Sequence, residues 1–385
     1  MTTRLIAGCA GLAVFFAVSA MSVAHGQGAK AGVSTGARTD LSWQMFRQNP
    51  CRTSAVLLDL PFSPQGKLRW VFPAEGQIDS SPAIHKGVVY VGSDDGNLYA
   101  IDERTGRMLW RTKLGGAVKS SPSVEGTAVF VGCEDGNLYA VDARLGKIHW
   151  KFSAADRLSS SPVVHGGTVF VGGWDGMVYA IDINSGALKW KSPVEGRITS
   201  SPAISGDALF VSAHGGSLYA MSITDGHLIW QYKTGNKIFA SPMIMDGTVY
   251  FGSWDRNFYA VDIGTGQTKW KFTGPETFSI SAAGADGRVF VGNDDLRMYC
   301  LDAATGKLLW KTQLNSPVPL LSSSPSVAGK MLFVGSCDGN LYALDVRNGA
   351  IKWKYKTQRP IYSSPAVTMS GVCVGSQDGN LYLLN

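Results

Sequence analysis

Tryptophan recurs along this 385-residue chain at an almost fixed interval. Six of the seven gaps between eight of the tryptophans are 40 residues long, and the last is 43. A fixed period of this length is typical of an array of small supersecondary units, each burying its apolar faces against its neighbours. It predicts one periodic body from about residue 43 to residue 385, although the length alone would allow two or three domains. The eight are Trp70, Trp110, Trp150, Trp190, Trp230, Trp270, Trp310 and Trp353.

Each repeat carries the signals of four short strands. In the first copy these are residues 80–84, 88–92, 97–101 and 107–113, and an Asp-Gly hairpin turn joins the second to the third. Four antiparallel strands in 40 residues are typical of a propeller blade. The strands are nearly continuous in apolar residues, as expected when neighbours cover both faces of a sheet. Eight of the thirteen tyrosines occupy one position in the third strand: Tyr99, Tyr139, Tyr179, Tyr219, Tyr259, Tyr299, Tyr342 and Tyr382.

The segment from Ala100 to Trp110 reads A-x-D-x-x-T-G-x-x-x-W, and a related segment recurs in every repeat. Seven copies are continuous. The eighth is split, because its first half ends the chain at residues 383–385 and its second half is residues 66–70. The sequence therefore predicts an all-β fold, an eight-bladed β-propeller of four antiparallel strands per blade. The N-terminal strand around Trp70 would complete the C-terminal blade and remove the open edges of the array.

The repeated segment resembles the tryptophan-docking motif of pyrroloquinoline-quinone (PQQ) enzyme-like repeats, which form eight-bladed propellers. The resemblance covers about residues 66–385. It implies that the eight periodic tryptophans stack between blades as structural docking residues and carry no chemistry. Residues 43–65, which contain Trp43, Met45, Phe46 and Arg47, are similar to the segment that precedes many such propellers.

The first 26 residues differ from the rest of the chain. Arg4 supplies a positive n-region, residues 12–18 the centre of an apolar stretch, and residues 22–24 a small-x-small cleavage site. This pattern predicts a secretory signal peptide over residues 1–26, with an uncleaved membrane anchor as the alternative. Cys9 has too few apolar residues before it to predict a lipid anchor. A flexible linker is expected over residues 27–42, and no other stretch reaches the ~20 apolar residues of a membrane span.

Five cysteines follow the predicted signal: Cys51, Cys133, Cys300, Cys337 and Cys373. An odd number without C-x-x-C spacing argues against a disulfide framework, a zinc site or a c-type haem. Three of them replace ordinary repeat residues, which favours packing thiols. The formal charge of +6 is small for this length and includes no basic run, so the sequence predicts no nucleic-acid binding.

The sequence lacks the residues that PQQ enzymes use to bind their cofactor and to catalyse oxidation. PQQ alcohol and methanol dehydrogenases resemble it in repeat but are longer. They use an adjacent Cys-Cys pair against the cofactor, Glu and Asn as calcium ligands and an Asp base. This sequence has no adjacent cysteines, no histidines at metal-ligand spacing, and only three extra residues around 315–321 as an insertion. We therefore expect no catalytic residues, no bound metal and no cofactor. The alternative is that the protein binds PQQ together with calcium.

Strand order places the loops that enter the first strands and the hairpins between second and third strands on one face. On that face, three consecutive repeats carry basic residues in the entry loops and aromatic residues on the hairpins. Other hairpins carry mostly acidic residues at or beside Asp94, Glu134, Asp294, Asp338 and Asp378. A basic and aromatic sector opposite an acidic one suits an acidic ligand or a protein partner. The sector comprises Arg157, Arg197, Lys237, Trp174, His214 and Trp254.

Simple turn packing is the alternative reading of these hairpin tips. The fourth repeat departs most from the others, since Ser212 replaces Gly, residues 214–216 replace the Asp-Gly tip and Ser222 replaces Asp. The preferred interpretation is an exported, monomeric, non-catalytic propeller in the periplasm. It would bind a protein of the cell envelope, in the manner of BamB-type outer-membrane assembly factors. The competing interpretation is a PQQ- or other small-ligand-binding oxidoreductase that uses the central funnel.

Overall fold

The computed structural model describes residues 43–56, 64–315 and 322–385. The predicted signal peptide, the linker over residues 27–42 and Cys9 lie outside these residues, as do 316–321 of the predicted insertion. Within the described part of the chain, no helix has the length and apolar character needed to cross a membrane.

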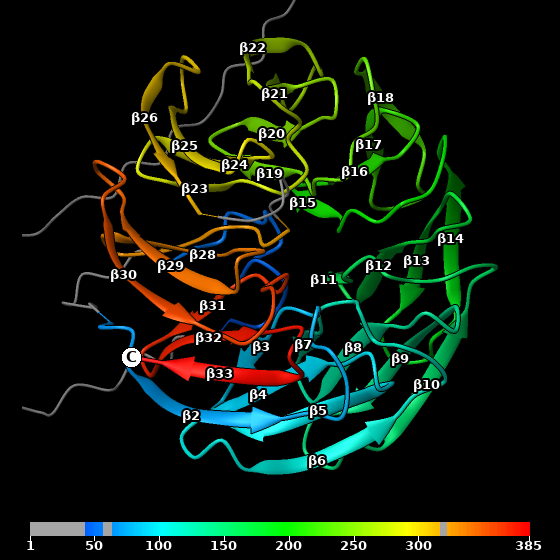
Figure 1. The fold of residues 1–385 in the computed structure, drawn as a ribbon. Helices are drawn as coiled ribbons and strands as arrows, with labels where there is room; N and C mark the ends of the chain where they lie inside the picture. The colour runs from blue at the N-terminus through cyan, green and yellow to red at the C-terminus, as the bar shows by residue number, and fades with distance from the viewer. Residues whose placement is uncertain (1–42, 57–63, 316–321) are drawn as a thin grey trace, which may run out of the picture. The chain divides into compact units, whose positions relative to one another are not determined.

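Eight sheets are arranged as the blades of a propeller, which confirms the predicted fold (Figure 1). Each blade consists of four antiparallel strands, and the first strand of each blade lies innermost. The first strands are β3 (Ala83–His85), β7 (Ser123–Glu125), β11 (Val163–His165), β15 (Ala203–Ser205), β19 (Met243–Met245), β23 (Ala283–Ala285), β27 (Ser326–Ala328) and β31 (Ala366–Thr368). The second strands are β4 (Val88–Gly92), β8 (Ala128–Gly132), β12 (Thr168–Gly172), β16 (Ala208–Ala213), β20 (Thr248–Gly252), β24 (Arg288–Asn293), β28 (Met331–Gly335) and β32 (Gly371–Gly375).

The second and third strands are almost entirely buried, and the fourth strands form the partly exposed outer rim. The third strands are β5 (Asn97–Asp102), β9 (Asn137–Asp142), β13 (Met177–Asp182), β17 (Ser217–Ser222), β21 (Asn257–Asp262), β25 (Arg297–Asp302), β29 (Asn340–Asp345) and β33 (Asn380–Leu384). The fourth strands are β6 (Met108–Lys113), β10 (Ile148–Ser153), β14 (Leu188–Pro193), β18 (Leu228–Lys233), β22 (Thr268–Thr273), β26 (Leu308–Gln313), β30 (Ile351–Lys356) and, from the other end of the chain, β2 (Leu68–Pro73).

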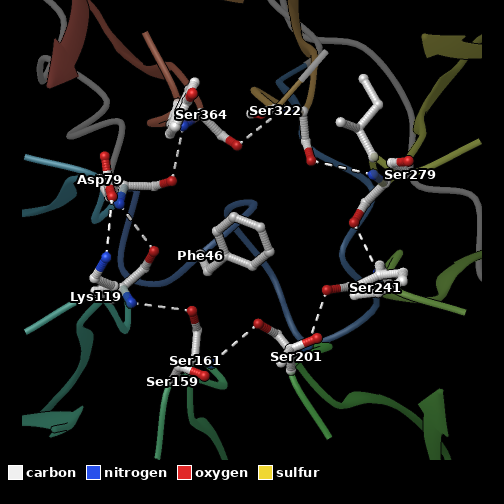
Figure 2. A pocket seen from close by; sticks show the side chains of 18 of the residues that line it. Phe46, Asp79, Lys119, Ser159, Ser161, Ser201, Ser241, Ser279, Ser322 and Ser364 are labelled. Carbon is white, nitrogen blue, oxygen red and sulfur yellow. Dashed lines mark hydrogen bonds and ion pairs between the residues drawn. The ribbon is translucent and has the colours of Figure 1, made fainter. Parts of the chain in front are cut away.

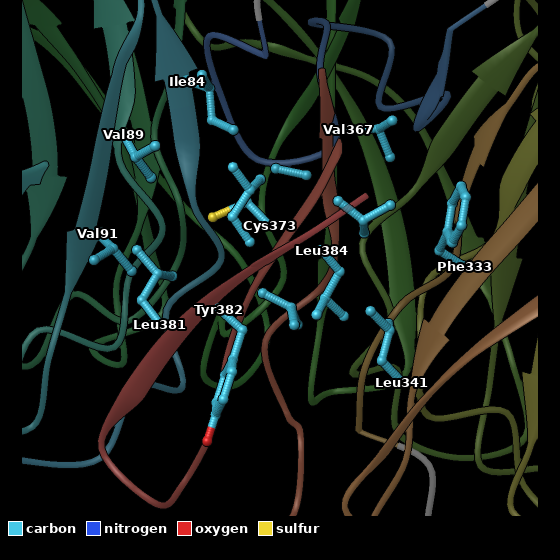
Figure 3. Close-up of a cluster of buried hydrophobic side chains, with 14 of the residues drawn as sticks. Ile84, Val89, Val91, Phe333, Leu341, Val367, Cys373, Leu381, Tyr382 and Leu384 are labelled. Carbon is cyan, nitrogen blue, oxygen red and sulfur yellow. The ribbon is translucent and has the colours of Figure 1, made fainter. Parts of the chain in front are cut away.

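The two ends of the propeller sequence meet in one blade, as predicted. β2 pairs with β33 in antiparallel register, and Trp70 lies opposite Leu383 (Figure 1). Lys67 and Asn385 exchange two backbone hydrogen bonds of 2.9 Å. Apolar side chains of the last blade, including Cys373 and Leu384, pack in one buried cluster with those of the blades on either side (Figure 3). The ring is therefore closed by strand pairing and by a continuous core.

Each periodic tryptophan reaches the following blade. The indole N–H of Trp150 donates to the carbonyl of Ile183 at 3.0 Å, and the other seven make the same bond at 2.5–3.1 Å. The indole of Trp150 also lies against Gly186, whose φ is +71° and whose added Cβ would come 2.7 Å from the ring. At the closure, Trp353 donates to the carbonyl of Pro64. The motif glycine thus provides both the left-handed turn and the space for the next ring.

The segment that precedes the propeller crosses the centre of the ring. Its backbone bonds to the innermost strands of six blades, beginning at Trp43, which exchanges two bonds of 2.7 Å with Ile84 of β3. It ends in β1 (Ala55–Val56), which pairs in parallel with β27. We call residues 43–56 the plug. The sequence analysis identified this segment only as a resemblance, and its position inside the ring is a finding of the structure.

Two arginines of the plug are almost completely buried. The Arg52 guanidinium donates to four backbone carbonyls, those of Phe46, Ser161, Pro162 and Pro202. Burial lowers the pKa of Arg52 to about 9. The three guanidinium nitrogens of Arg47 are buried without a hydrogen-bond partner in the described chain. Burial, and then the nearby charge of Arg52, hold the pKa of Arg47 well below its usual range.

Candidate functional site

The entry loops and the hairpins between second and third strands share one face of the ring, which we call the mouth face. In the third, fourth and fifth blades the backbone N–H of the hairpin tip donates to the carbonyl of the entry loop. Trp174 donates to Arg157 at 3.0 Å. His214 donates to Arg197, and Trp254 to Lys237, both at 2.9 Å. The structure therefore brings together the six residues that the sequence analysis grouped.

Two stacks of side chains lie at these positions on the mouth face. The guanidinium carbons of Arg157 and Arg197 lie 5.1 and 4.9 Å from the centroid of Trp174, which is cation–π distance. Phe239 lies between the other two rings, 4.1 Å from the centroid of His214 and 4.5 Å from that of Trp254. We call the seven residues the crescent: Arg157, Trp174, Arg197, His214, Lys237, Phe239 and Trp254.

Hydrogen bonds hold the aromatic rings of the crescent in place. The indole N–H of Trp174 donates to Ser159 Oγ at 2.6 Å, and that of Trp254 to Ser279 Oγ at 3.0 Å. His214 Nε2 lies 2.7 Å from Thr199 Oγ1. Burial, then Lys237 and Arg197, lower the pKa of His214, so its ring is neutral at pH 7. The positive charge of the crescent therefore comes from its two arginines and its lysine.

Phe239 was missed by the sequence analysis, although the repeat contains a signal for it. It occupies the position two residues after the entry-loop residue, where most other blades carry a polar residue. A large apolar side chain at a polar repeat position is a candidate contact residue, because the repeat framework does not require it.

The acidic hairpin residues do not form one continuous sector. Asp94 and Asp79 both face Lys119, whose Nζ is 3.5 and 3.6 Å from their carboxylates. Asp338 and Asp378 instead accept the hydroxyl protons of the third-strand tyrosines in their own blades. The residues at the tips of those two hairpins are Cys337 and Gln377. The predicted acidic sector is therefore weaker than the sequence suggested, because two of its carboxylates have a structural role.

The fourth blade departs from the others in its bonds as well as its sequence. Tyr179 in the third blade donates to Asp175. Tyr219 has no such carboxylate and accepts the backbone N–H of Glu195 at 3.0 Å. Ser212 Oγ is buried without a partner in the described chain, although the Ser212 carbonyl accepts from Ser200 at 2.7 Å.

A circle of eight serines surrounds the channel beside the crescent (Figure 2). In every blade, the backbone N–H of one serine donates to the Oγ of the equivalent serine in the next blade, at 2.8–3.2 Å. The eighth bond, from Ser364 to Ser81, closes the circle at 2.8 Å. The members are Ser81, Ser121, Ser161, Ser201, Ser241, Ser281, Ser324 and Ser364.

The serine circle forms the wall of a cavity of about 350 Å³, which we call the serine cup. Figure 2 shows the Phe46 ring of the plug at the centre of the circle, with its face visible through the opening. Asp79, Lys119, Tyr362 and part of the crescent, including Phe239 and Trp254, also line the cavity. The sequence signal for the circle is the 40-residue recurrence of serine just before the first strand. The sequence analysis assigned these serines only to the strand.

The serine cup does not fit PQQ with calcium. Asp79 is the one carboxylate among the residues that line it, and it is held by Lys119 and by Gln377, whose amide donates to it at 3.2 Å. Among the described residues no three His, Cys, Asp or Glu side chains are grouped so as to hold a metal ion. The five cysteines after the predicted signal are free thiols, and four of them are buried.

The protein is a repeat β-propeller. Its mouth face combines a serine that is the same in all eight blades with neighbouring residues that differ from blade to blade. Two family models match the chain. The β-propeller of the beta-alanine-activating enzyme matches residues 78–273, and the outer membrane protein assembly factor BamB matches residues 259–385. The chain belongs to the PQQ-enzyme-like repeat β-propeller family, as the tryptophan motif predicted.

Solved structures share the fold at low sequence identity. BamB from Moraxella catarrhalis is 19% identical, with a TM-score of 0.73 over 82% of this chain and 98% of that one. A europium-containing methanol dehydrogenase is 17% identical, with a TM-score of 0.77 over 88% and 91%. The quinohemoprotein alcohol dehydrogenase from Comamonas testosteroni is 16% identical, with a TM-score of 0.74 over 89% and 80%. A search of curated protein sequences found no match.

Proposed function

We propose that the protein is an exported, monomeric, non-catalytic propeller that binds another protein of the cell envelope through the crescent. The observation that carries the proposal is the exposure of three cations beside ordered aromatic rings. Arg197 and Lys237 have no carboxylate within 4.0 Å in the described chain, and Arg157 is 3.8 Å from Glu134. Arginine and tryptophan are the residues most enriched among those that dominate binding energy at interfaces.

The charge of the crescent indicates the chemistry of the partner. Three exposed cations on consecutive blades suit an acidic surface and would raise the rate of association with it at low salt. The aromatic rings between them supply apolar contact area at little entropic cost, because hydrogen bonds already hold their indole and imidazole groups. The family match to BamB over residues 259–385 supports a function in envelope protein assembly. A location in the periplasm follows from the predicted signal peptide.

We expect replacement of Arg157, Arg197 and Lys237 by Ala to abolish capture of envelope proteins by the purified protein. All three side chains are exposed, so the melting temperature should stay within about 2 °C. Affinity capture from envelope extract, followed by mass spectrometry, measures the loss. The matched control replaces Lys151, Lys191 and Lys271, three exposed lysines of outer strands, and removes the same charge. Capture that is unchanged in the crescent variant, or lost equally in the control, contradicts the proposal.

The second candidate is an oxidoreductase that holds PQQ or another small ligand in the central funnel. The specific observation in its favour is the serine cup, a cavity at the centre of the mouth face. Because the cup does not provide calcium ligands, we expect no dye-linked alcohol oxidation after incubation with PQQ and calcium. A quinone absorption shift together with alcohol oxidation would support the oxidoreductase and contradict the binding protein.

A further inference from the structure

The serine circle has unused hydrogen-bonding capacity. Each Oγ accepts one backbone N–H, and none of the eight donates its own proton to an acceptor in the described chain. A hydroxyl has one donor and two acceptor positions. Each serine hydroxyl can therefore still donate one hydrogen bond to, and accept one from, a molecule in the cup. The side chains are 4–6% exposed, and all eight line the cavity.

The floor of the cup is aromatic. The Phe46 ring stands at the centre of the circle (Figure 2). The Arg52 guanidinium carbon lies over this ring, 5.5 Å from its centroid. Arg52 is fully buried and donates to the carbonyl of Phe46, so it holds the residue that carries the ring in place. The face of an aromatic ring carries the negative part of its quadrupole. It attracts the positive C–H edges of a ligand and disfavours an anion placed directly on it.

The rim of the cup carries charged groups that compensate one another. Lys119 lies between Asp79 and Asp94, at 3.6 and 3.5 Å. Of these three, Asp79 and Lys119 line the cavity, and their opposite charges offset each other while both can still form hydrogen bonds with a ligand. Phe239 and Trp254 add an aromatic side to the same rim. The cup therefore combines hydroxyl walls, an aromatic floor and a nearly neutral charged rim.

We propose that the serine cup binds a pyranose ring of a saccharide. Sugar hydroxyls both donate and accept, which matches the free donor and acceptor on each serine, and the C–H face of a pyranose suits the Phe46 ring. The volume of about 350 Å³ lies at the lower end of small-molecule pockets, which hold roughly 300–1,000 Å³. Because Phe239 and Trp254 of the mouth face line the cavity, we expect the sugar to enter from that face. A planar cofactor with few hydroxyls would leave the serine donors unpaired, at a cost in affinity.

The test uses the full protein with glucose, N-acetylglucosamine, maltose and diacetylchitobiose as probes. We expect saturable binding of at least one sugar by calorimetry, with a change in tryptophan fluorescence because Trp254 lines the cup. Phe46→Leu should weaken that binding about tenfold or more, while Phe46→Tyr keeps an aromatic floor and the affinity. Ser322→Trp, which places an indole at the rim, should abolish binding. The control Ala304→Trp adds the same ring to an exposed turn and should have no effect.

Two results would overturn the assignment. One is the absence of binding by all four sugars up to about 50 mM, which corresponds to a negligible affinity. The other is undiminished binding by Ser322→Trp or Phe46→Leu, provided that their melting curves show folded protein. The sugar measurement involves no envelope partner, and the crescent variants change no residue of the cup. The two proposals can therefore fail separately.

Discussion

Deletion of residues 66–70 is expected to prevent the ring from folding. The deleted residues include Leu68, which is paired with Leu384 of β33, and Lys67, which exchanges two backbone hydrogen bonds with Asn385, so the first half of the outer strand of the last blade would be lost. They also include Trp70, which is 9% exposed and donates to the carbonyl of Glu103 in the first blade. Burial of one tryptophan removes roughly 200 Å² from water, or about 5 kcal/mol. That is comparable to the total stability of many domains, about 5–15 kcal/mol.

Circular dichroism melting and size-exclusion chromatography measure the effect of the deletion. We expect aggregation, or loss of the cooperative transition. A control that keeps the strand replaces Leu68 and Val71, whose side chains are exposed, with Thr. It should melt within about 3 °C of the natural protein. A soluble, monomeric deletion protein with an unchanged melting curve would show that the N-terminal strand does not close the ring.

Arg52→Met is expected to lower the free energy of unfolding by at least about 3 kcal/mol. The substitution removes all the donors that Arg52 provides to four backbone carbonyls, two of which belong to Pro162 and Pro202 beside the first strands of the third and fourth blades. Each buried acceptor left without a partner costs roughly 1–3 kcal/mol. The plug would also lose the contact that supports Phe46. Urea denaturation of the purified variant measures the change.

Arg47→Met is the matched control, because it removes the same group from the same plug. Arg47 is as deeply buried as Arg52, but its guanidinium has no hydrogen-bond partner in the described chain. Replacement of a buried charge by an apolar side chain of similar volume is often neutral or stabilising. It also relieves the repulsion between the two guanidinium groups. We expect unchanged or increased stability, and a loss larger than that of Arg52→Met would contradict this description of the plug.

The eight-bladed propeller could be predicted from the sequence because its repeats make equivalent contacts. The 40-residue interval and the Asp-Gly turns, which occur in five of the eight blades, depend on local chain geometry and recur along the sequence. The motif split between Trp70 and residues 383–385 could be recognised because its other copies are continuous. The shared position of Arg157 and Trp174 on one face followed from strand order alone.

Contacts between distant or unrepeated segments could not be predicted in this way. The plug occurs once, and several of its bonds join residues more than a hundred positions apart, such as Pro50 and Ile204. The serine circle depends on how close neighbouring blades lie to one another at the propeller axis. This distance cannot be read from the sequence. Asp338 and Asp378 were grouped with the acidic tips because a carboxylate that accepts a tyrosine hydroxyl looks the same in sequence as an exposed one.

Site-specific photocrosslinking tests the partner-binding function of the crescent most directly. A benzophenone side chain at Asn236, which is exposed beside Lys237, should form an adduct with an envelope protein on irradiation of envelope extract. The same group at Asp207, on the exposed turn between the first and second strands of the fourth blade, should form none. An adduct from position 236 alone is the predicted result. No adduct from either position, or the same adducts from both, would contradict the assignment of the crescent as the partner face.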